Sequence, residues 1–233
     1  MQALITGGTK GIGAAIAHTL LTHEIDVHIN ARNIDDLKSQ HTELTQTFPL
    51  RKITWSANDL STTAGVQSLV ADYQSANETL DILVNNAGVF LPGMTTEEEE
   101  GSLSKMIETN LYSAYHLTRA LLPLVLKSAN GHIFNMCSIA SKVAYPNGGS
   151  YSISKFALYG YTKVLREELK EKGVKVTAIL PGATWSNSWA GVDLPQSRLM
   201  EANDIAISVI SAIQMSPSAV VEEIVVRPQL GDL

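Results

Sequence analysis

Short apolar runs alternate with longer stretches of helical length and spacing along most of the chain. The short runs predict strands, and the longer stretches predict amphipathic helices. Strands that alternate with helices are joined by right-handed crossovers into a parallel sheet covered on both faces. We therefore predict an α/β fold with a doubly wound parallel sheet. The expected strands cover 3–5, 25–30, 53–55, 82–84, 132–135, 174–180 and 223–226, and the expected helices cover 12–21, 34–47, 63–76, 103–126, 151–172 and 204–214.

Composition fits a single compact domain and argues against several classes of function. Hydrophobic residues make up 45% and charged residues 17% of the 233 residues, which is typical of a globular chain. A net charge of −6 without a basic cluster argues against a nucleic-acid surface. No apolar run reaches the ~18 residues of a membrane-spanning helix, and the first residues do not resemble a signal peptide. We expect a soluble, cytoplasmic protein that binds neither nucleic acid nor membrane.

Cysteine and histidine usage indicates no metal site. Cys137 is the single cysteine, so neither an intramolecular disulfide nor a cysteine zinc cluster can form. Because Cys137 ends a predicted buried strand, we expect a small core residue and not a nucleophile. The six histidines lack metal-ligand spacing, and no metal is expected.

A glycine-rich turn, TGGTKGIG at Thr6 to Gly13, separates the first predicted strand from the first predicted helix. Glycines allow a sharp turn and a close approach to a ligand, and a helix N-terminus presents unpaired N–H groups to a pyrophosphate. Ala14 and Ala15 stand where a P-loop needs lysine and serine or threonine, so ATP is disfavoured. A tight turn without a ligand is the alternative interpretation.

The segment NARN after the second predicted strand bears on cofactor choice. An NAD site usually has an acidic residue at this strand end for the ribose hydroxyls, whereas this chain has Ala31 followed by Arg32. Arginine can bind a 2′-phosphate, and Lys10 in the glycine turn adds a second positive charge. The sequence therefore favours NADP(H) over NAD(H), unless both cations are simply solvated.

The segment YSISK places Tyr151 and Lys155 four residues apart in a predicted helix. Residues at this spacing share one helix face. A cation beside a phenol favours the phenolate, so Lys155 is expected to lower the pKa of Tyr151 and make it a usable acid/base. An isolated pair of this kind also arises by chance on exposed helices, so the interpretation needs support from the rest of the chain.

Six motifs in order resemble those of the short-chain dehydrogenase/reductase family. The glycine turn resembles its TGxxxGxG element, NNAG at Asn85 to Gly88 its motif after the fourth strand, and YSISK its YxxxK pair. Asn110 and Ser138 stand where the family has its active-site asparagine and serine, and Pro181-Gly182 resembles its PG after the sixth strand. The resemblance covers the chain from Thr6 to about Ser186.

The resemblance implies a Rossmann-like fold, a nicotinamide cofactor and hydride transfer between NADP(H) and a carbonyl or alcohol substrate. Tyr151 would be the acid/base, Lys155 would bind the nicotinamide ribose, Ser138 would hydrogen-bond the substrate oxygen, and Asn110 would hold a water that relays protons. Asp59 would contact the adenine, and Asn85 would steady the sheet. The implied cofactor-binding residues are Gly7, Thr9, Lys10, Gly11, Ile12, Gly13, Arg32, Asp59, Asn85, Ala87, Gly88, Tyr151, Lys155, Pro181, Gly182 and Thr184.

Domain organisation and specificity follow from the same resemblance. We expect residues 1–233 to form one dinucleotide-binding and catalytic domain, with a substrate loop at about 183–200 that carries Trp185 and Trp189. These tryptophans wall an apolar pocket or pack the loop onto the body. The resemblance implies a homodimer or homotetramer, although the C-terminus departs from the family pattern. The acidic run Glu97 to Glu100 is interpreted as a solvated helix start without a function.

Three other functions remain open at this point. The first is a dehydrogenase of the same fold that prefers NAD(H). The second is a cofactor-binding sensor or scaffold without turnover. The third is a dehydratase or epimerase, whose chemistry would proceed without net oxidation of the cofactor.

Overall fold

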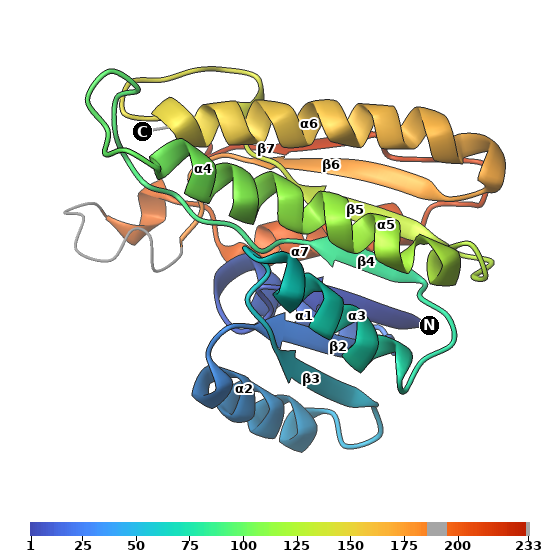
Figure 1. The fold of residues 1–233 in the computed structure, drawn as a ribbon. Helices are drawn as coiled ribbons and strands as arrows, with labels where there is room; N and C mark the ends of the chain where they lie inside the picture. Colours follow the sequence, from blue (N-terminus) through green and yellow to red (C-terminus); the bar gives the residue numbers. More distant parts are fainter. Residues whose placement is uncertain (186–194, 232–233) are drawn as a thin grey trace.

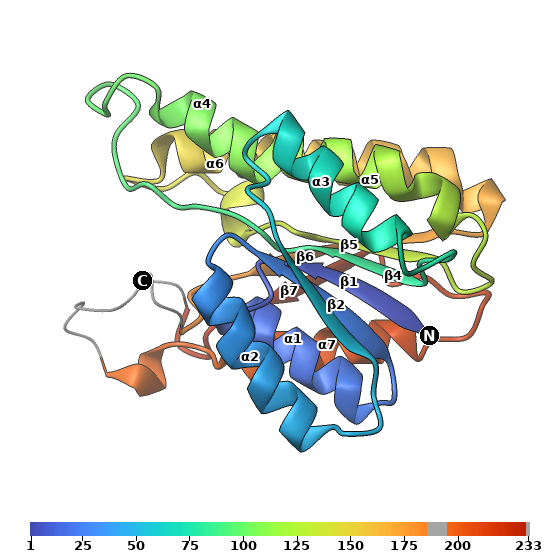
Figure 2. The same cartoon turned by 60° about the horizontal axis from the view of Figure 1, so that its bottom comes forward.

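A computed structural model of the chain describes residues 1–185 and 195–231. These residues form three layers, with a parallel sheet between two layers of helices (Figures 1 and 2). Helices α3, α4, α5 and α6 cover one face of the sheet, and α1, α2 and α7 cover the other. The Rossmann-like, doubly wound fold expected from the sequence is therefore confirmed.

The strands and helices alternate as predicted. The strands are β1 (Gln2–Thr6), β2 (Asp26–Ala31), β3 (Ile53–Ala57), β4 (Ile82–Asn85), β5 (His132–Met136), β6 (Lys175–Pro181) and β7 (Glu223–Val226). The helices are α1 (Gly11–Thr22), α2 (Ile34–Thr47), α3 (Thr63–Gln74), α4 (Ser102–Ile107), α5 (Ser113–Val125), α6 (Gly149–Leu169) and α7 (Ala202–Ile213). Short helical turns are η1 (Glu108–Tyr112), η2 (Ile139–Ser141), η3 (Lys170–Lys172) and η5 (Gln196–Arg198).

The strand order creates the place where a ligand can bind. The order is β3-β2-β1-β4-β5-β6-β7, and every neighbouring pair is parallel. The chain builds outward from β1 to β3 and then crosses back to place β4 on the other side of β1. In sheets of this kind the ligand crevice lies beyond the carboxyl ends of the strands at this reversal. The strands β1, β4 and β5 all end at this crevice, and the segments that follow them begin there.

The central strands β1, β4, β5 and β6 contribute side chains to two separate apolar cores, one on each face of the sheet. On β1, Ala3 and Ile5 pack in the core beneath α1 and α7, whereas Leu4 packs in the core beneath α3, α5 and α6. On β5, Phe134 belongs to the first core and Ile133 to the second. This alternation follows from the twofold repeat of a strand and fixes which residues face each helix layer.

The predicted helix 103–126 is interrupted in the structure. It forms α4, a π-helical turn (η1) and α5, and the N–H of Ser113 donates to the carbonyl of Glu108 five residues earlier. The apolar pattern does not reveal this wider turn, because one extra residue shifts the phase without changing the composition. Asn110 lies inside the π-helical turn and is buried. Such turns occur often at functional sites.

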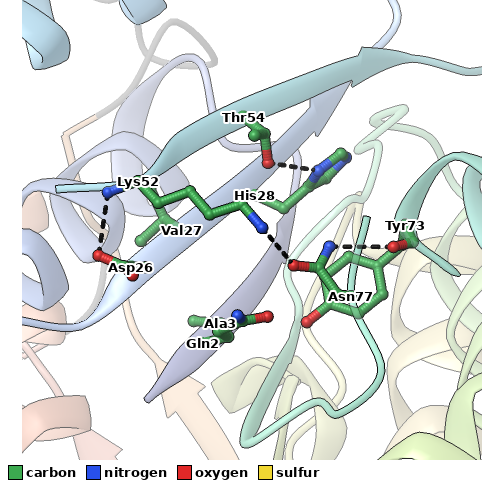
Figure 3. A pocket seen from close by; sticks show the side chains of 9 residues that line it. All are labelled: Gln2, Ala3, Asp26, Val27, His28, Lys52, Thr54, Tyr73 and Asn77. Atoms are coloured by element: carbon green, nitrogen blue, oxygen red, sulfur yellow. Dashed lines mark hydrogen bonds between the residues drawn. The ribbon is translucent and has the colours of Figure 1, made fainter. Parts of the chain in front are cut away.

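A small cavity lies at the opposite edge of the sheet, near the amino ends of β1, β2 and β3 (Figure 3). Its lining includes Gln2, His28 and Lys52, and the ammonium of Lys52 donates to Asn77 at 2.9 Å. The volume of about 10 Å³ has room for about one water molecule and not for a substrate. The candidate site is therefore sought at the carboxyl ends of the strands. None of the described helices is long and apolar enough to cross a membrane.

Candidate active site

The glycine turn between β1 and α1 is built for close backbone packing. Gly7 has a φ of +64°, and a Cβ placed on Gly13 would lie 2.2 Å from the carbonyl oxygen of Gly7. No side chain can fill this space without moving the backbone. Lys10, the N-cap of α1, makes no side-chain cap, and the first turn of α1 contains no acidic residue. Its N–H groups are therefore available to an anion such as a pyrophosphate.

Two residues that the sequence analysis left out of the site hold this turn in place. The hydroxyl of Thr6 accepts from the N–H groups of Asn86 at 3.0 Å and Ala87 at 2.9 Å. The side-chain amide of Asn86 donates to the carbonyls of Thr6 at 2.9 Å and Gly7 at 3.1 Å. These bonds connect the turn after β1 to the segment after β4. The second asparagine of NNAG was the available sequence signal.

Two residues, Arg32 and Lys10, were predicted to bind the 2′-phosphate, and one of them is already paired with a carboxylate. Arg32 is exposed in the turn between β2 and α2. The ammonium of Lys10 lies 2.6 Å from a carboxylate oxygen of Asp36, in the first turn of α2. The second positive charge expected from Lys10 is thus paired with a carboxylate in the structure. Asp36 takes up this position because Asn33 caps α2, accepting from the N–H groups of Asp35 and Asp36.

Asp59, expected beside the adenine, is exposed in the segment after β3. Its carboxylate accepts from the N–H of Ser61 at 3.0 Å and from the Ser61 hydroxyl at 2.8 Å. These contacts form a local turn. The Asp59 side chain is thus oriented by its own loop, at the same edge of the sheet as the glycine turn.

Four polar residues converge where β4, β5 and α6 meet. Lys155 is 4% exposed, and its ammonium donates to the carbonyl of Met136, the last residue of β5, at 2.7 Å. The same nitrogen lies 5.7 Å from the ring centre of Tyr151. The Ser138 side chain lies beside Tyr151, close enough to favour its phenolate form. Phenol, serine hydroxyl and amine therefore lie on the same side of the molecule.

Asn110 completes this group from the π-helical turn. Its side-chain oxygen accepts from the N–H of Val89 at 2.7 Å. Its side-chain NH2 donates to the backbone carbonyl of Val89 at 3.0 Å and to the Ser154 hydroxyl at 2.9 Å. A Cβ placed on Gly88 would lie 3.1 Å from the Asn110 side-chain oxygen and 3.6 Å from the Lys155 nitrogen. A side chain at Gly88 would therefore crowd the Asn110 oxygen, and it would lie in ordinary contact with Lys155.

The pKa of Tyr151 is shifted in the direction opposite to the prediction. Burial raises the pKa of Tyr151 to about 12, and the interaction with the Ser138 side chain only partly offsets this shift. Lys155 does not compensate, because its ammonium is directed to the Met136 carbonyl and burial lowers its own pKa to about 8. The phenol consequently keeps its proton at neutral pH. Cys137 is buried in the core, as expected, and burial raises the pKa of its thiol to about 11.

Similarity to known proteins decides the family. The sequence profile described as short chain dehydrogenase matches residues 1–195. A sepiapterin reductase of Chlorobaculum tepidum is 33% identical over 238 residues, covering 99% of this chain and 97% of that protein.

The chain belongs to the short-chain dehydrogenase/reductase family.

Solved structures of this oxidoreductase family have the same architecture. An alcohol dehydrogenase of Thermococcus sibiricus, in complex with 5-hydroxy-NADP, matches with a TM-score of 0.90 at 25% identity, covering 98% of this chain and 96% of that one. A metagenomic short-chain oxidoreductase in complex with NADP matches with a TM-score of 0.85 at 29% identity, covering 98% of this chain and 97% of that one. Both matches extend over nearly all of the fold described above.

Asn85, in the NNAG motif of this short-chain dehydrogenase/reductase, lies in a buried polar row. Its amide donates to the Thr118 hydroxyl at 3.0 Å and to the Asn135 side-chain oxygen at 2.8 Å, and Asn135 in turn donates to Thr162 at 2.9 Å. The row connects α5, β4, β5 and α6. It supports the expectation that Asn85 steadies the sheet beneath the site.

The residues after β6 are only partly described. The N–H of Gly182 donates to the Val226 carbonyl at 2.8 Å, and Thr184 is buried with its hydroxyl donating to the Gly182 carbonyl at 3.0 Å. Trp185 is 39% exposed and its N–H donates to the Met200 carbonyl. Trp189 lies outside the described residues. Within 1–185 and 195–231, no three histidine, cysteine, aspartate or glutamate side chains gather as metal ligands.

Proposed function

We propose that this chain is an NADP(H)-dependent oxidoreductase that interconverts a carbonyl compound and an alcohol, with Tyr151 as the acid/base. One observation carries the proposal. The phenol of Tyr151 lies beside the Ser138 side chain, which favours its phenolate form, and the Lys155 ammonium lies 5.7 Å from the Tyr151 ring centre. A carbonyl oxygen bound between these two side chains would face two hydroxyl groups at once.

The chemistry of carbonyl reduction fits these two hydroxyl groups. A bound NADPH would supply a hydride to the carbonyl carbon, and negative charge then develops on the carbonyl oxygen. Ser138 donates a hydrogen bond to that oxygen, and Tyr151 delivers the proton that makes the alcohol. A phenol whose pKa is about 12 holds that proton throughout the neutral range. In the reverse direction Tyr151 accepts the proton.

Lys155 and Asn110 support this proton transfer. With a pKa of about 8, Lys155 is largely protonated at neutral pH and can donate to a ribose hydroxyl of the cofactor. Asn110 is held at both ends of its side chain by Val89, so it fixes the NNAG segment against the π-helical turn. We propose that Asn110 also holds a water molecule that relays protons.

The glycine turn supports cofactor binding. Backbone N–H groups at the start of α1 would bind the pyrophosphate, because Gly7 and Gly13 leave no side chain in the way. Thr9, Gly11 and Ile12 belong to the same glycine-rich segment, and the Ile12 side chain packs against the core. Arg32 would bind the 2′-phosphate, Asp59 the adenine, and Ala87, Pro181, Gly182 and Thr184 the nicotinamide half.

One observation favours a second candidate, a dehydrogenase that prefers NAD(H). Asp36 already pairs with Lys10, so a carboxylate lies next to the place where a 2′-phosphate would bind. The NADP complexes of the structural neighbours and the exposed guanidinium of Arg32 support NADP(H). Steady-state kinetics with both cofactors distinguishes the candidates, and equal or better use of NADH would overturn the NADP(H) preference.

The proposal extends to the organisation of the chain. Residues 1–233 would form one dinucleotide-binding and catalytic domain, with a substrate loop at about 183–200. By family analogy the protein would be a cytoplasmic homodimer or homotetramer. Consumption of NADPH in a panel of ketones, aldehydes and alcohols tests the function. Binding of NADPH without turnover across that panel would instead indicate a sensor or scaffold, and product formation without cofactor oxidation would indicate a dehydratase or epimerase.

A further inference from the structure

Glu98 differs from the other members of the acidic run Glu97–Glu100. The other three are exposed, whereas Glu98 is half-buried. Its N–H donates to the Met94 carbonyl at 2.8 Å, which bends the chain so that the side chain reaches α6. One carboxylate oxygen accepts a hydrogen bond from the Ser150 hydroxyl. The other is buried and has no hydrogen-bond partner among the described residues.

The start of α6 lacks a cap of its own. Gly148, the N-cap residue, has no side chain, and the first turn of α6 contains no acidic residue. The first N–H groups of a helix have no partner within it, and a carboxylate nearby stabilises that end. The buried Glu98 oxygen lies 3.3 Å from the position of a Cβ on Gly149, the first residue of α6. Glu98 therefore supplies the missing negative charge from a distant segment.

Glycines bring the two segments close enough for this contact. The N–H of Gly93 donates to the Asn147 carbonyl at 3.1 Å, and Gly93 and Gly148 form a parallel bridge. A Cβ on Gly149 would lie 2.6 Å from the Gly93 carbonyl oxygen. The backbone at Gly93 thus contacts the backbone at the start of α6, the helix that carries Tyr151. Glu98 adds a side-chain contact between the same two segments.

The same segment, residues 89–98, contacts two of the proposed catalytic residues on its way to Glu98. The Val89 backbone holds Asn110 through two hydrogen bonds. The Phe90 ring packs edge-on against the Tyr151 ring at 4.9 Å between centres. Tyr151 is the third residue of α6, so any fraying of the first turn displaces the phenol.

We propose that Glu98 is a positioning residue, whose carboxylate fixes the first turn of α6 and with it the Tyr151 hydroxyl. The inference rests on the proposed function, because it concerns the reacting geometry of Tyr151. Glu98 does not contact the glycine turn or Arg32, so its loss is expected to affect the chemical step more than cofactor binding.

Two substitutions separate the charge from the hydrogen bond. Glu98→Gln keeps an oxygen that accepts from Ser150 and removes the charge, whereas Glu98→Ala removes both. Glu100→Gln, at an exposed position in the same run, is the matched control. We expect Glu98→Ala to lower kcat about 10- to 100-fold, the range for a misplaced catalytic group. Glu98→Gln is expected to lower kcat about 3- to 10-fold, in line with the effect of a charge at a helix N-terminus.

The readouts distinguish positioning from a general loss of stability. The KM for NADPH is expected to stay within about twofold in both variants, and Glu100→Gln is expected to match the parent protein. Adding Ser150→Ala to Glu98→Ala should cost little more than the single change, because the two side chains act as a pair. A kcat unchanged in Glu98→Ala, or an equal loss in Glu100→Gln, would overturn the proposal.

Hydrogen exchange tests the inference without any turnover. The amides of Gly93 and Ser152 report the contact, since they donate to Asn147 and Gly148. Both are expected to exchange about tenfold faster in Glu98→Ala, and protection elsewhere in α6 should persist. Unchanged exchange at both amides would overturn the positioning role. If the parent protein turns over no carbonyl substrate but the exchange result holds, the proposed function fails while the capping by Glu98 stands.

Discussion

Two buried histidines should make the fold sensitive to mild acid. His28 on β2 bonds through its ring nitrogens to Thr54 and Ser56, both at 2.9 Å, and borders the small cavity of Figure 3. His132 on β5 bonds to Thr177 at 2.8 Å and stacks on Phe134. Burial lowers the pKa of His28 to about 4 and that of His132 to about 3. Both imidazoles are therefore neutral in the folded protein at neutral pH.

The direction of the effect follows from proton binding. Between pH 6.5 and the lowered values, the unfolded chain binds protons at these two histidines and the folded chain does not. The free energy of unfolding therefore falls as the pH decreases through this window. From pH 7.5 to pH 5.0 each histidine contributes a loss of about 2 kcal/mol, so the pair contributes about 4 kcal/mol. Against a typical total of about 5–15 kcal/mol, such a loss is easily measured.

Urea unfolding at pH 7.5, 6.5, 5.5 and 5.0, at one protein concentration, provides the assay. His132→Gln retains a hydrogen-bonding group for Thr177 but cannot titrate, so the loss between pH 7.5 and 5.0 should be about halved. His23→Gln, at an exposed position, is the control and should keep the full loss. A free energy of unfolding that is flat across this range in the parent protein would refute the reasoning. So would a full loss in both His132→Gln and His28→Gln.

Four further substitutions test the proposed function. Tyr151→Phe should lower kcat about 10²- to 10⁴-fold while NADPH binding stays close to normal, because only the proton donor is lost; activity within tenfold of the parent contradicts this. Arg32→Ala should weaken NADPH binding about tenfold or more with little effect on NADH binding. Asp36→Asn should improve the preference for NADPH up to about fivefold, because it releases Lys10. The ratio of the KM values for the two cofactors measures both effects, and a matched change for NADPH and NADH argues against each. Gly13→Ala should abolish binding of either cofactor in a fluorescence titration, because its Cβ would lie 2.2 Å from the Gly7 carbonyl oxygen. An unchanged Kd would contradict the proposed role of the glycine turn in cofactor binding.

The sequence predicted the secondary structure well because its signals are local. All seven predicted strands are present, and their ends differ from the predictions by at most about two residues. The exception is the region 103–126, where the π-helical turn follows from hydrogen bonds and packing around Asn110 and not from residue composition. Periodicity detects which residues face the core, and it does not detect one residue added to a turn.

The site was predicted as a set of residues, but its electrostatics were not. A four-residue spacing correctly places Tyr151 and Lys155 on neighbouring positions of α6, yet it does not show that the ammonium of Lys155 is directed to the Met136 carbonyl. The same limit applies to Lys10, whose partner Asp36 lies on a different helix. Burial and long-range partners determine both outcomes, and neither can be read from spacing alone.

The π-helical turn between α4 and α5 constrains how the length of this chain can vary. Removing one residue from 108–112 would restore ordinary α-helical geometry and rotate everything before it by about 100° relative to α5. Met106 on α4 would then leave the interior while Leu117 on α5 stayed there. An exposed loop would tolerate such a deletion. Here it would turn the buried side of α4 toward solvent.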